Sequence, residues 1–87
     1  MSDSTQSPES WYVYIAICSD GSLYTGISND VDKRIEKHNL GAGAKYTKGR
    51  FPVKLIYVEK LADKSEASKR EAELKKWPRD KKLKLLN

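Results

Sequence analysis

Five side chains in this sequence are suited to acid–base and phosphate chemistry: Tyr14, Tyr24, Arg34, His38 and Glu71. They supply phenols, a guanidinium, the chain's one imidazole and a carboxylate. A single histidine excludes a histidine-rich zinc site, and no Ser/His/Asp or Cys/His nucleophile set can be assembled from the chain. The remaining groups are suited to metal-assisted cleavage of phosphodiester bonds.

Each of these side chains also has an ordinary structural interpretation. Tyrosines in strands are usually core aromatics with their hydroxyls at the rim, and an arginine with a histidine on one helix is usually a solvated face. Glu71 is the most informative residue, because it falls on the apolar stripe of its expected helix, where a carboxylate needs a cation or hydrogen bonds to offset its desolvation. A structural ion pair with a lysine or an arginine is the favoured explanation of such a lone glutamate.

A hairpin should carry the two tyrosines. Residues 11–17 alternate in hydrophobicity with the period of a strand, residues 23–28 form a second predicted strand, and an Asp-Gly pair lies between them. A two-residue turn would put Tyr14 and Tyr24 on opposite faces of the sheet, whereas a three-residue loop or a one-residue bulge would put them on the same face. Only the second arrangement permits chemistry that the two tyrosines share.

A short helix should follow the hairpin. It is predicted from about residue 30 to residue 41, capped by Ser28 or Asn29. Within it Arg34 and His38 are four positions apart and therefore lie on one face.

Three further elements complete the predicted fold. A third strand is expected at residues 53–59, followed by a helix that is capped by Asp63 or Ser65 and runs to Trp77. Pro78 prevents this helix from continuing and suits the first turn of a short last helix.

The positive charge of the chain is concentrated in its second and third parts. Residues 1–32 contain five acidic residues and no basic one, whereas residues 33–63 (8 basic, 3 acidic) and 64–87 (9 basic, 4 acidic) are each +5. Such asymmetry indicates an anionic partner, although lysines that only keep a small protein soluble are the alternative. The glycine-rich segment 40–50 lacks the ending of a P-loop, but its cations could contact nucleic-acid phosphates: Lys45, Lys48 and Arg50.

The length of 87 residues predicts one small domain, which we assign to residues 11–87 after a disordered tail of residues 1–10. No apolar run approaches the about 20 residues of a membrane span, and no segment has the layout of a signal peptide. Cys18 is the only cysteine, which excludes an intramolecular disulfide and makes a reducing cytoplasm the simplest setting. We expect no membrane partner and assume a monomer.

The order and spacing of these residues resemble the GIY-YIG nuclease family. Val13-Tyr14-Ile15 is followed by Tyr24-Thr25-Gly26 and then by Arg34, His38 and Glu71. The segments SDGSLYTG and GAKYTKGRFPV are similar to the small stand-alone bacterial branch of the family, and the resemblance covers about residues 11–85. Two positions depart from the pattern: Val13 replaces the first glycine of the GIY motif, and Ile27 stands where some repair-nuclease relatives have a lysine.

The resemblance implies a chemistry for each matched residue. One divalent metal ion, Mg²⁺ or Mn²⁺, would be held by Glu71, which matches the single catalytic glutamate of the family. Tyr24 would activate or orient the attacking water, with Tyr14 assisting at the same centre. Arg34 would stabilise the charge on the phosphate, and His38 would transfer a proton or contact the phosphate.

We therefore predict an α/β (α+β) fold, with a three-stranded antiparallel sheet flanked by helices in the order β-β-α-β-α-α. The predicted function is that of a metal-dependent endonuclease that hydrolyses phosphodiester bonds in DNA, in a pathway such as repair or recombination. Two alternatives remain open. One is a module that binds nucleic acid without cutting it, and the other is an adaptor whose basic face meets an acidic protein.

Overall fold

The alternating residues 11–17 form the central strand of a three-stranded antiparallel sheet with the strand order β2-β1-β3. The computed structural model describes residues 10–42 and 49–86. Its elements are β1 (Trp11–Ile17), β2 (Leu23–Ser28), α1 (Val31–Asn39), β3 (Lys54–Leu61), α2 (Lys64–Lys75), α3 (Arg79–Leu83) and the 3₁₀ helix η2 (Lys84–Leu86). The predicted α+β fold and the order of its elements are confirmed, while the predicted tail, apart from Ser10, lies outside the described residues.

The hairpin between β1 and β2 closes with a three-residue loop, residues 19–21. The amide of Cys18 donates to the carbonyl of Ser22 at 2.8 Å, and the amide of Gly21 donates to the carbonyl of Cys18 at 2.9 Å. Gly21 has a φ of +86°, which a residue with a side chain rarely adopts, so glycine suits this position in the loop. The loop length gives the register Tyr14↔Gly26 and Ala16↔Tyr24, so both tyrosines point to the same face of the sheet.

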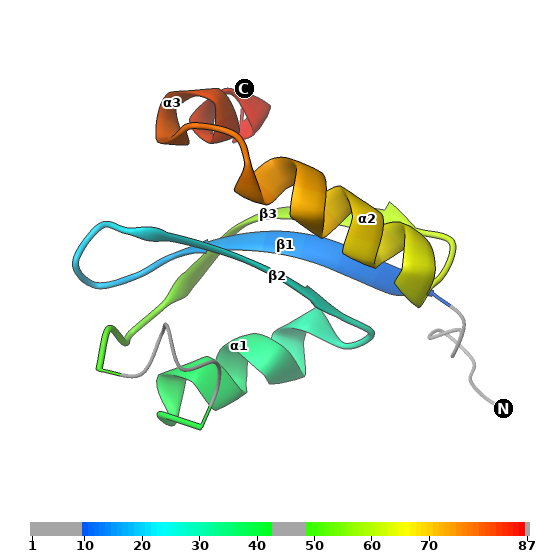
Figure 1. Cartoon of the computed structure of the whole chain (residues 1–87). Coiled ribbons are helices and arrows are strands. Elements are labelled where there is room, and N and C mark those ends of the chain that lie inside the picture. The colour runs from blue at the N-terminus through cyan, green and yellow to red at the C-terminus, as the bar shows by residue number, and fades with distance from the viewer. Residues whose placement is uncertain (1–9, 43–48, 87) are drawn as a thin grey trace, which may run out of the picture.

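Helices cover both faces of the sheet. In Figure 1, α1 lies against one face, and α2 lies against the opposite face with α3 beyond its end. On the α1 side the buried side chains of Ala16, Cys18 and Val53 pack together with the partly buried Tyr24 and Ile35. On the α2 side the helix contributes Ala67 and Leu74, both with no exposed surface. The two tyrosines therefore point into the layer between the sheet and α1.

The third strand differs from its predicted bounds for two reasons. It begins at Lys54 because the amide and carbonyl of Val53 are hydrogen-bonded to the side chain of Asn39, at the end of α1, and not to a strand. It extends to Leu61 because that residue pairs with Trp11 at the start of β1. The pairing with β1 shifts by one residue between Ile15 and Ala16, which marks a bulge in β3.

The helix ends also differ in detail from the prediction. Asp30, not Ser28 or Asn29, caps α1 by accepting from the amide of Lys33 at 3.2 Å. Of the two predicted caps of α2, Asp63 is the one that the structure has, and it accepts from the amide of Glu66 at 2.9 Å.

The end of α2 comes two residues before the predicted Trp77. The amides of Lys76 and Trp77 donate to carbonyls three residues back, which tightens the last turn. In addition, Pro78 disfavours helical backbone at the residue before it, Trp77. Pro78 is the N-cap residue of α3, one position before its first turn.

Candidate active site

A hydrogen bond between Tyr14 and His38 lies at the centre of the candidate site. The Tyr14 hydroxyl is 2.9 Å from His38 Nε2, and neither residue has any exposed surface. The bond joins β1 to the last turn of α1, across the layer that the two elements enclose. The bond satisfies one polar atom on each of these two buried side chains, and it fixes where α1 sits on the sheet.

Tyr24 packs against both members of this pair. Its ring centroid is 5.2 Å from that of His38 and 6.1 Å from that of Tyr14, in tilted and edge-on arrangements typical of aromatic pairs. Tyr24 is only partly buried, so of the three rings it is the one that solvent reaches. The three side chains form one cluster, which we call the tyrosine–histidine cluster.

The burial of the cluster determines its protonation. Burial raises the pKa of Tyr14 to about 12, with Tyr24 and Glu71 adding to the rise and the hydrogen bond and charge of Arg34 opposing it. Burial, followed by the charge of Arg34, lowers the pKa of His38 below its ordinary value of 6.5. At neutral pH a protonated phenol therefore lies beside a neutral imidazole. This arrangement fits a Tyr14 hydroxyl that donates to His38 Nε2, with the ring proton on Nδ1.

Arg34 lies on α1 one turn before His38, as the four-residue spacing predicts. Its guanidinium is close enough to affect the pKa of both Tyr14 and His38. It also lines a hollow of about 260 Å³ at the start of α1, together with two lysines, one aspartate and two uncharged polar residues: Lys33, Lys37, Asp30, Ser28 and Asn29. Arg34 thus connects the buried cluster to a basic surface.

Glu71 comes to the site from the other side of the sheet. It lies on α2 between the buried Ala67 and Leu74, and its side chain is 23% exposed. Its carboxylate is 3.3 Å from the ammonium of Lys75, an i,i+4 pair whose lysine is 54% exposed. The structural ion pair weighed from the sequence therefore exists, but with a solvated partner and not a buried one. Since the charge of Glu71 also acts on the pKa of Tyr14, the carboxylate is electrostatically coupled to the cluster.

A second hollow, of about 240 Å³, lies beside Tyr24 and was not predicted from the sequence. Residues of β2, α2 and the last helix line it: Leu23, Tyr24, Thr25, Lys75 and Lys82. Lys82 Nζ donates to the Thr25 hydroxyl at 3.2 Å across 57 positions of sequence. No local pattern signals this contact, because it depends on how α3 folds back on β2.

The predicted phosphate contacts at residues 45–50 are only partly visible. Lys45 and Lys48 lie outside the described residues. Arg50 donates from Nη1 to the carboxylate of Asp20 at 2.6 Å, and its carbonyl accepts from the amide of Ser19 at 2.8 Å. Arg50 therefore ties the chain before β3 to the hairpin loop, and a phosphate would have to compete with Asp20 for its guanidinium.

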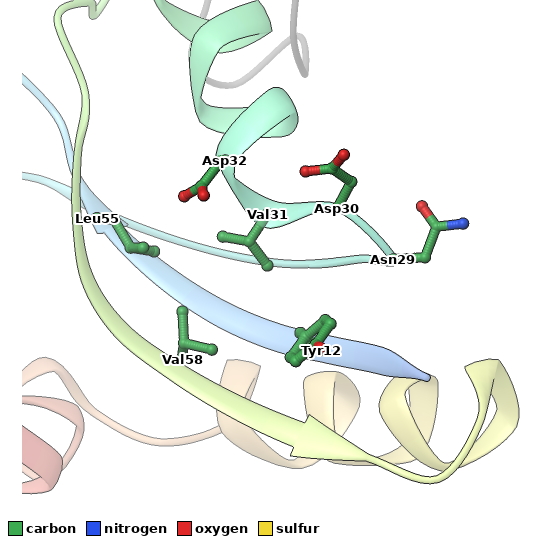
Figure 2. Close-up of a pocket in the computed structure, with 7 residues that line it drawn as sticks. All are labelled: Tyr12, Asn29, Asp30, Val31, Asp32, Leu55 and Val58. Atoms are coloured by element: carbon green, nitrogen blue, oxygen red, sulfur yellow. The ribbon is translucent and has the colours of Figure 1, made fainter. Parts of the chain in front are cut away.

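A third hollow, of about 210 Å³, has acidic side chains at its rim. Figure 2 shows Val31 of α1 facing Tyr12 and Val58 of the sheet, with the carboxylates of Asp30 and Asp32 beside it. Asn29 and Leu55 complete the lining. Its lining contains two carboxylates and no basic residue, which makes this hollow unsuited to a phosphate, although Asn29 and Asp30 also border the hollow of Arg34.

The described residues contain no cluster of three or more histidine, cysteine, aspartate or glutamate side chains that could hold a metal ion. Among candidate metal ligands, Glu71 is the one carboxylate whose charge acts on the cluster in the pKa shifts of Tyr14 and His38. In the same ranges, 10–42 and 49–86, no helix has the length and apolar character that crossing a membrane requires.

The two departures from the sequence pattern both have a structural explanation. Val13 has no exposed surface and lies opposite the partly buried Ile27 in the β1–β2 register. Both point to the face opposite Tyr14, against α2. They are core residues on the α2 side of the sheet and lie away from the tyrosine–histidine cluster.

Comparison with known proteins places this geometry in a family. Residues 10–84 match a family model described as the GIY-YIG catalytic domain. The chain is 60% identical over 78 residues to a UPF0213 protein of Staphylococcus aureus (strain Mu3 / ATCC 700698), covering 90% of this chain and 95% of that protein. Two solution NMR structures are also similar. The UPF0213 protein BH0048 from Bacillus halodurans has 49% identity and a TM-score of 0.56, over 88% of this chain and 82% of that one. The protein EF2693 from E. faecalis has 42% identity and a TM-score of 0.63, over 94% and 88%.

Proposed function

The chain belongs to the GIY-YIG family, and from this premise we propose that it is a metal-dependent endonuclease that hydrolyses phosphodiester bonds in DNA. The observation that carries the proposal is the buried hydrogen bond between Tyr14 and His38, with Tyr24 packed against both rings. A small fold does not need a buried phenol–imidazole pair for stability, since an apolar pair of similar size would fill the space without a polar group to satisfy.

In this proposal Tyr24 is the residue that faces the attacking water. It is the partly exposed member of the cluster, so its hydroxyl can orient a water molecule while its ring stays fixed by Tyr14 and His38. His38 has no exposed surface, which disfavours direct contact with a phosphate. Its role is to take up or release a proton through the Tyr14 hydroxyl, and a neutral imidazole is ready to accept one.

Arg34 stabilises the negative charge that develops on the phosphate. A guanidinium presents several donors in a fixed geometry, and electrostatic stabilisation by such preorganised donors is often the largest contribution to phosphoryl transfer. The lysines that share its hollow, Lys33 and Lys37, add positive charge at the same place.

Glu71 is the residue that would hold the metal ion. Mg²⁺ is commonly bound through one or two carboxylates, with water and substrate phosphates completing its shell, so a single partly exposed carboxylate fits this group. When bound, such an ion lowers the pKa of the attacking water and offsets charge on the phosphate. The side chain of Lys75 must release Glu71 for the metal to bind, and its own exposure makes this release inexpensive.

The Glu71–Lys75 pair also favours a second candidate function, that of a nucleic-acid-binding module that does not cut. If the carboxylate serves only to hold Lys75 in place, residues 10–42 and 49–86 offer no other carboxylate that acts on the tyrosine–histidine cluster to bind the metal. The two functions differ in what they require of Glu71, and this difference provides the test.

The test is the substitution Glu71→Gln, which keeps the size of the side chain and removes its charge. Wild-type protein should cleave labelled duplex, branched or single-stranded DNA with Mg²⁺ or Mn²⁺ and not with EDTA. The variant should keep its melting temperature within a few degrees and its DNA affinity, because the carboxylate's partner is exposed, while cleavage falls by at least about 100-fold.

Two results would contradict the nuclease. One is a folded Glu71→Gln protein that cuts at the wild-type rate, which would remove Glu71 from the catalytic machinery. The other is wild-type protein that binds DNA and never cuts it with either metal, which would establish the binding module. Labelled RNA of the same sequence, tested in parallel, decides the class of nucleic acid.

A further inference from the structure

The hollow beside Tyr24 lies at a free edge of the sheet. β2 is an edge strand in the order β2-β1-β3, and Leu23, Tyr24 and Thr25 are its first three residues. Tyr24 points toward the α1 layer, whereas Lys75 and Lys82 approach from α2 and α3 on the other side. Tyr24 therefore belongs both to the lining of this hollow and to the tyrosine–histidine cluster.

Two contacts hold α3 against the β1–β2 hairpin. Arg79 Nη1 donates to the carbonyl of Gly21 in the hairpin loop at 2.6 Å, and Lys82 Nζ donates to the Thr25 hydroxyl at 3.2 Å. They lie one turn apart at the two ends of α3, so this helix is fixed in position relative to the hairpin. The ammonium of Lys82 is thereby held in the hollow and does not extend freely into solvent.

The two ammonium groups in the hollow are unfavourably close to each other. The pKa of Lys82 is lowered by burial and, after that, by the charge of Lys75. Among residues 10–42 and 49–86, Lys75 has the exposed pair with Glu71, and Lys82 has no carboxylate within ion-pair distance. Two like charges in a partly desolvated hollow oppose folding, and an anion bound between them would reverse this effect.

We propose that Lys75 and Lys82 form a phosphate-binding subsite that holds the backbone phosphate next to the scissile one in a bound DNA strand. This inference rests on the proposed function for the position of the scissile phosphate, at Tyr24, Arg34 and Glu71. The hollow's volume of about 240 Å³ accommodates a phosphate group, and Leu23 provides an apolar wall for the sugar.

The shared wall formed by Tyr24 is what makes the two phosphates neighbours. In this proposal the scissile phosphate lies at Tyr24, and the next phosphate, one nucleotide away, lies in the hollow, because Tyr24 also lines that hollow. The ammonium of Lys75 would also become available to this phosphate when a metal ion binds Glu71, because Glu71 is its ion-pair partner in the present structure. Binding of the metal and of the phosphate therefore favour each other.

The first experiment measures DNA affinity without cleavage. Fluorescence anisotropy of a labelled duplex is recorded in EDTA over a series of salt concentrations, for wild-type protein and for the double variant Lys75→Gln/Lys82→Gln. Because both ammoniums hold one phosphate, the log–log slope of affinity against salt should become less steep by about 0.9 in the double variant. The single variants should each show part of the loss in affinity.

The matched control is the double variant Lys60→Gln/Lys69→Gln. It removes the same charge from exposed positions on β3 and α2 that do not line the hollow. Its slope should equal that of the wild-type protein. If the two double variants change the slope equally, the lysines of the hollow act only through net charge and the subsite is overturned.

The second experiment locates the phosphate. A strand with one neutral methylphosphonate next to the cleavage site should bind wild-type protein more weakly than the unmodified strand does. The double variant Lys75→Gln/Lys82→Gln should bind the two strands equally. Loss of affinity in both proteins would overturn the assignment.

The outcomes separate this inference from the proposed function. Protein that never cleaves, but whose double variant loses slope relative to the control, supports the subsite and contradicts the nuclease. Protein that cleaves DNA, but whose double variant has the same slope as the control, supports the nuclease and contradicts the subsite.

Discussion

A side chain at position 26 would have no room in this structure. A Cβ there would lie 2.7 Å from Tyr14 Oη and 2.9 Å from both Tyr14 Cζ and Tyr24 Cε2, closer than carbon atoms in proteins approach. Gly26 is directly opposite Tyr14 in the register, so its missing side chain is what lets the Tyr14 ring lie over β2 and reach His38. The glycine of the family's second motif is thus a steric requirement of the tyrosine–histidine cluster.

The substitution Gly26→Ala tests this requirement. The added methyl group must displace the tyrosine rings, and overpacking of this kind destabilises a core by about 1–3 kcal/mol. The same substitution in a Tyr14→Phe background should be less destabilising, because the closest contact, with Tyr14 Oη, is absent. Urea unfolding of the wild type and the three variants measures the coupling, and additive effects would contradict the steric explanation.

His38 should make stability decrease as the pH falls through the region around 6.5, the ordinary pKa of an imidazole. Its pKa in the folded protein is below 6.5, so as pH falls through this range the unfolded chain takes up a proton that the folded protein does not. Stability is therefore fully present above the unfolded pKa and decreases on acidification, by at most about 1.4 kcal/mol per pH unit.

The control for this pH dependence is His38→Gln. His38 is the only histidine, so no other side chain has its ordinary pKa in this window, and the variant should show a nearly flat profile. Unfolding midpoints at several pH values measure both proteins. A wild-type profile as flat as that of the variant would show that His38 titrates alike in the folded and unfolded states.

At the scale of elements, local patterns predicted the parts of the fold that depend on neighbours in sequence. The two hairpin strands, the Asp63 cap of α2 and the shared helix face of Arg34 and His38 all follow from short-range periodicity and capping. The register of the hairpin could not be predicted, because it depends on whether the loop has two or three residues, and both are compatible with an Asp-Gly pair.

Contacts between distant segments account for what the sequence did not predict. The start of β3 depends on the side chain of Asn39, which occupies the backbone of Val53 from 14 residues away. The cation of Arg50 is taken by Asp20, and Lys82 reaches the site through Thr25. Each contact depends on the packed arrangement of two elements and has no signature in the local sequence.

The helix α2 should show competition between Lys75 and a metal ion for Glu71. Removal of the lysine in Lys75→Gln leaves the carboxylate unpaired and removes a like charge near the bound cation. We expect Mn²⁺ to bind the DNA-free protein roughly threefold more tightly, since an exposed i,i+4 pair contributes about 0.3–0.5 kcal/mol and the lost repulsion adds to it. Calorimetry or Mn²⁺ paramagnetic resonance measures the affinity.

Lys76→Gln is the matched control for this competition. It removes the same charge from the next, exposed position at the end of the helix. Equal affinities in the two variants would show that Lys75 does not compete for Glu71. Unchanged Mn²⁺ affinity in Glu71→Gln would remove the metal from this site altogether.

At the scale of the whole molecule, positive charge is not spread evenly over the hollows. The hollows beside Tyr24 and Arg34 carry lysines, whereas the lining of the hollow between α1 and β3 has two carboxylates and no basic residue. Asp30 borders the Arg34 hollow as well, but three cations outnumber it there. Both basic hollows are connected to the tyrosine–histidine cluster. One contains Tyr24, a member of the cluster, and the other contains Arg34, whose charge acts on Tyr14 and His38. A polyanion drawn to the protein, which has a net charge of +5, is thus guided toward the candidate site and away from the acidic hollow.

This distribution predicts a steep dependence of DNA affinity on salt. Each duplex phosphate that the protein neutralises contributes about −0.9 to the log–log slope, so contact with about four phosphates would weaken binding roughly 150-fold between about 50 and about 200 mM salt. Anisotropy titrations of a labelled duplex in EDTA measure the slope, and polyglutamate of equal total charge serves as the competitor. A nucleic-acid protein should be displaced far less well by polyglutamate than by unlabelled duplex, because the subsites described above fit phosphates with a defined spacing. Affinity that hardly changes with salt, or equal displacement by the two polyanions, would instead favour an adaptor whose basic face meets an acidic protein.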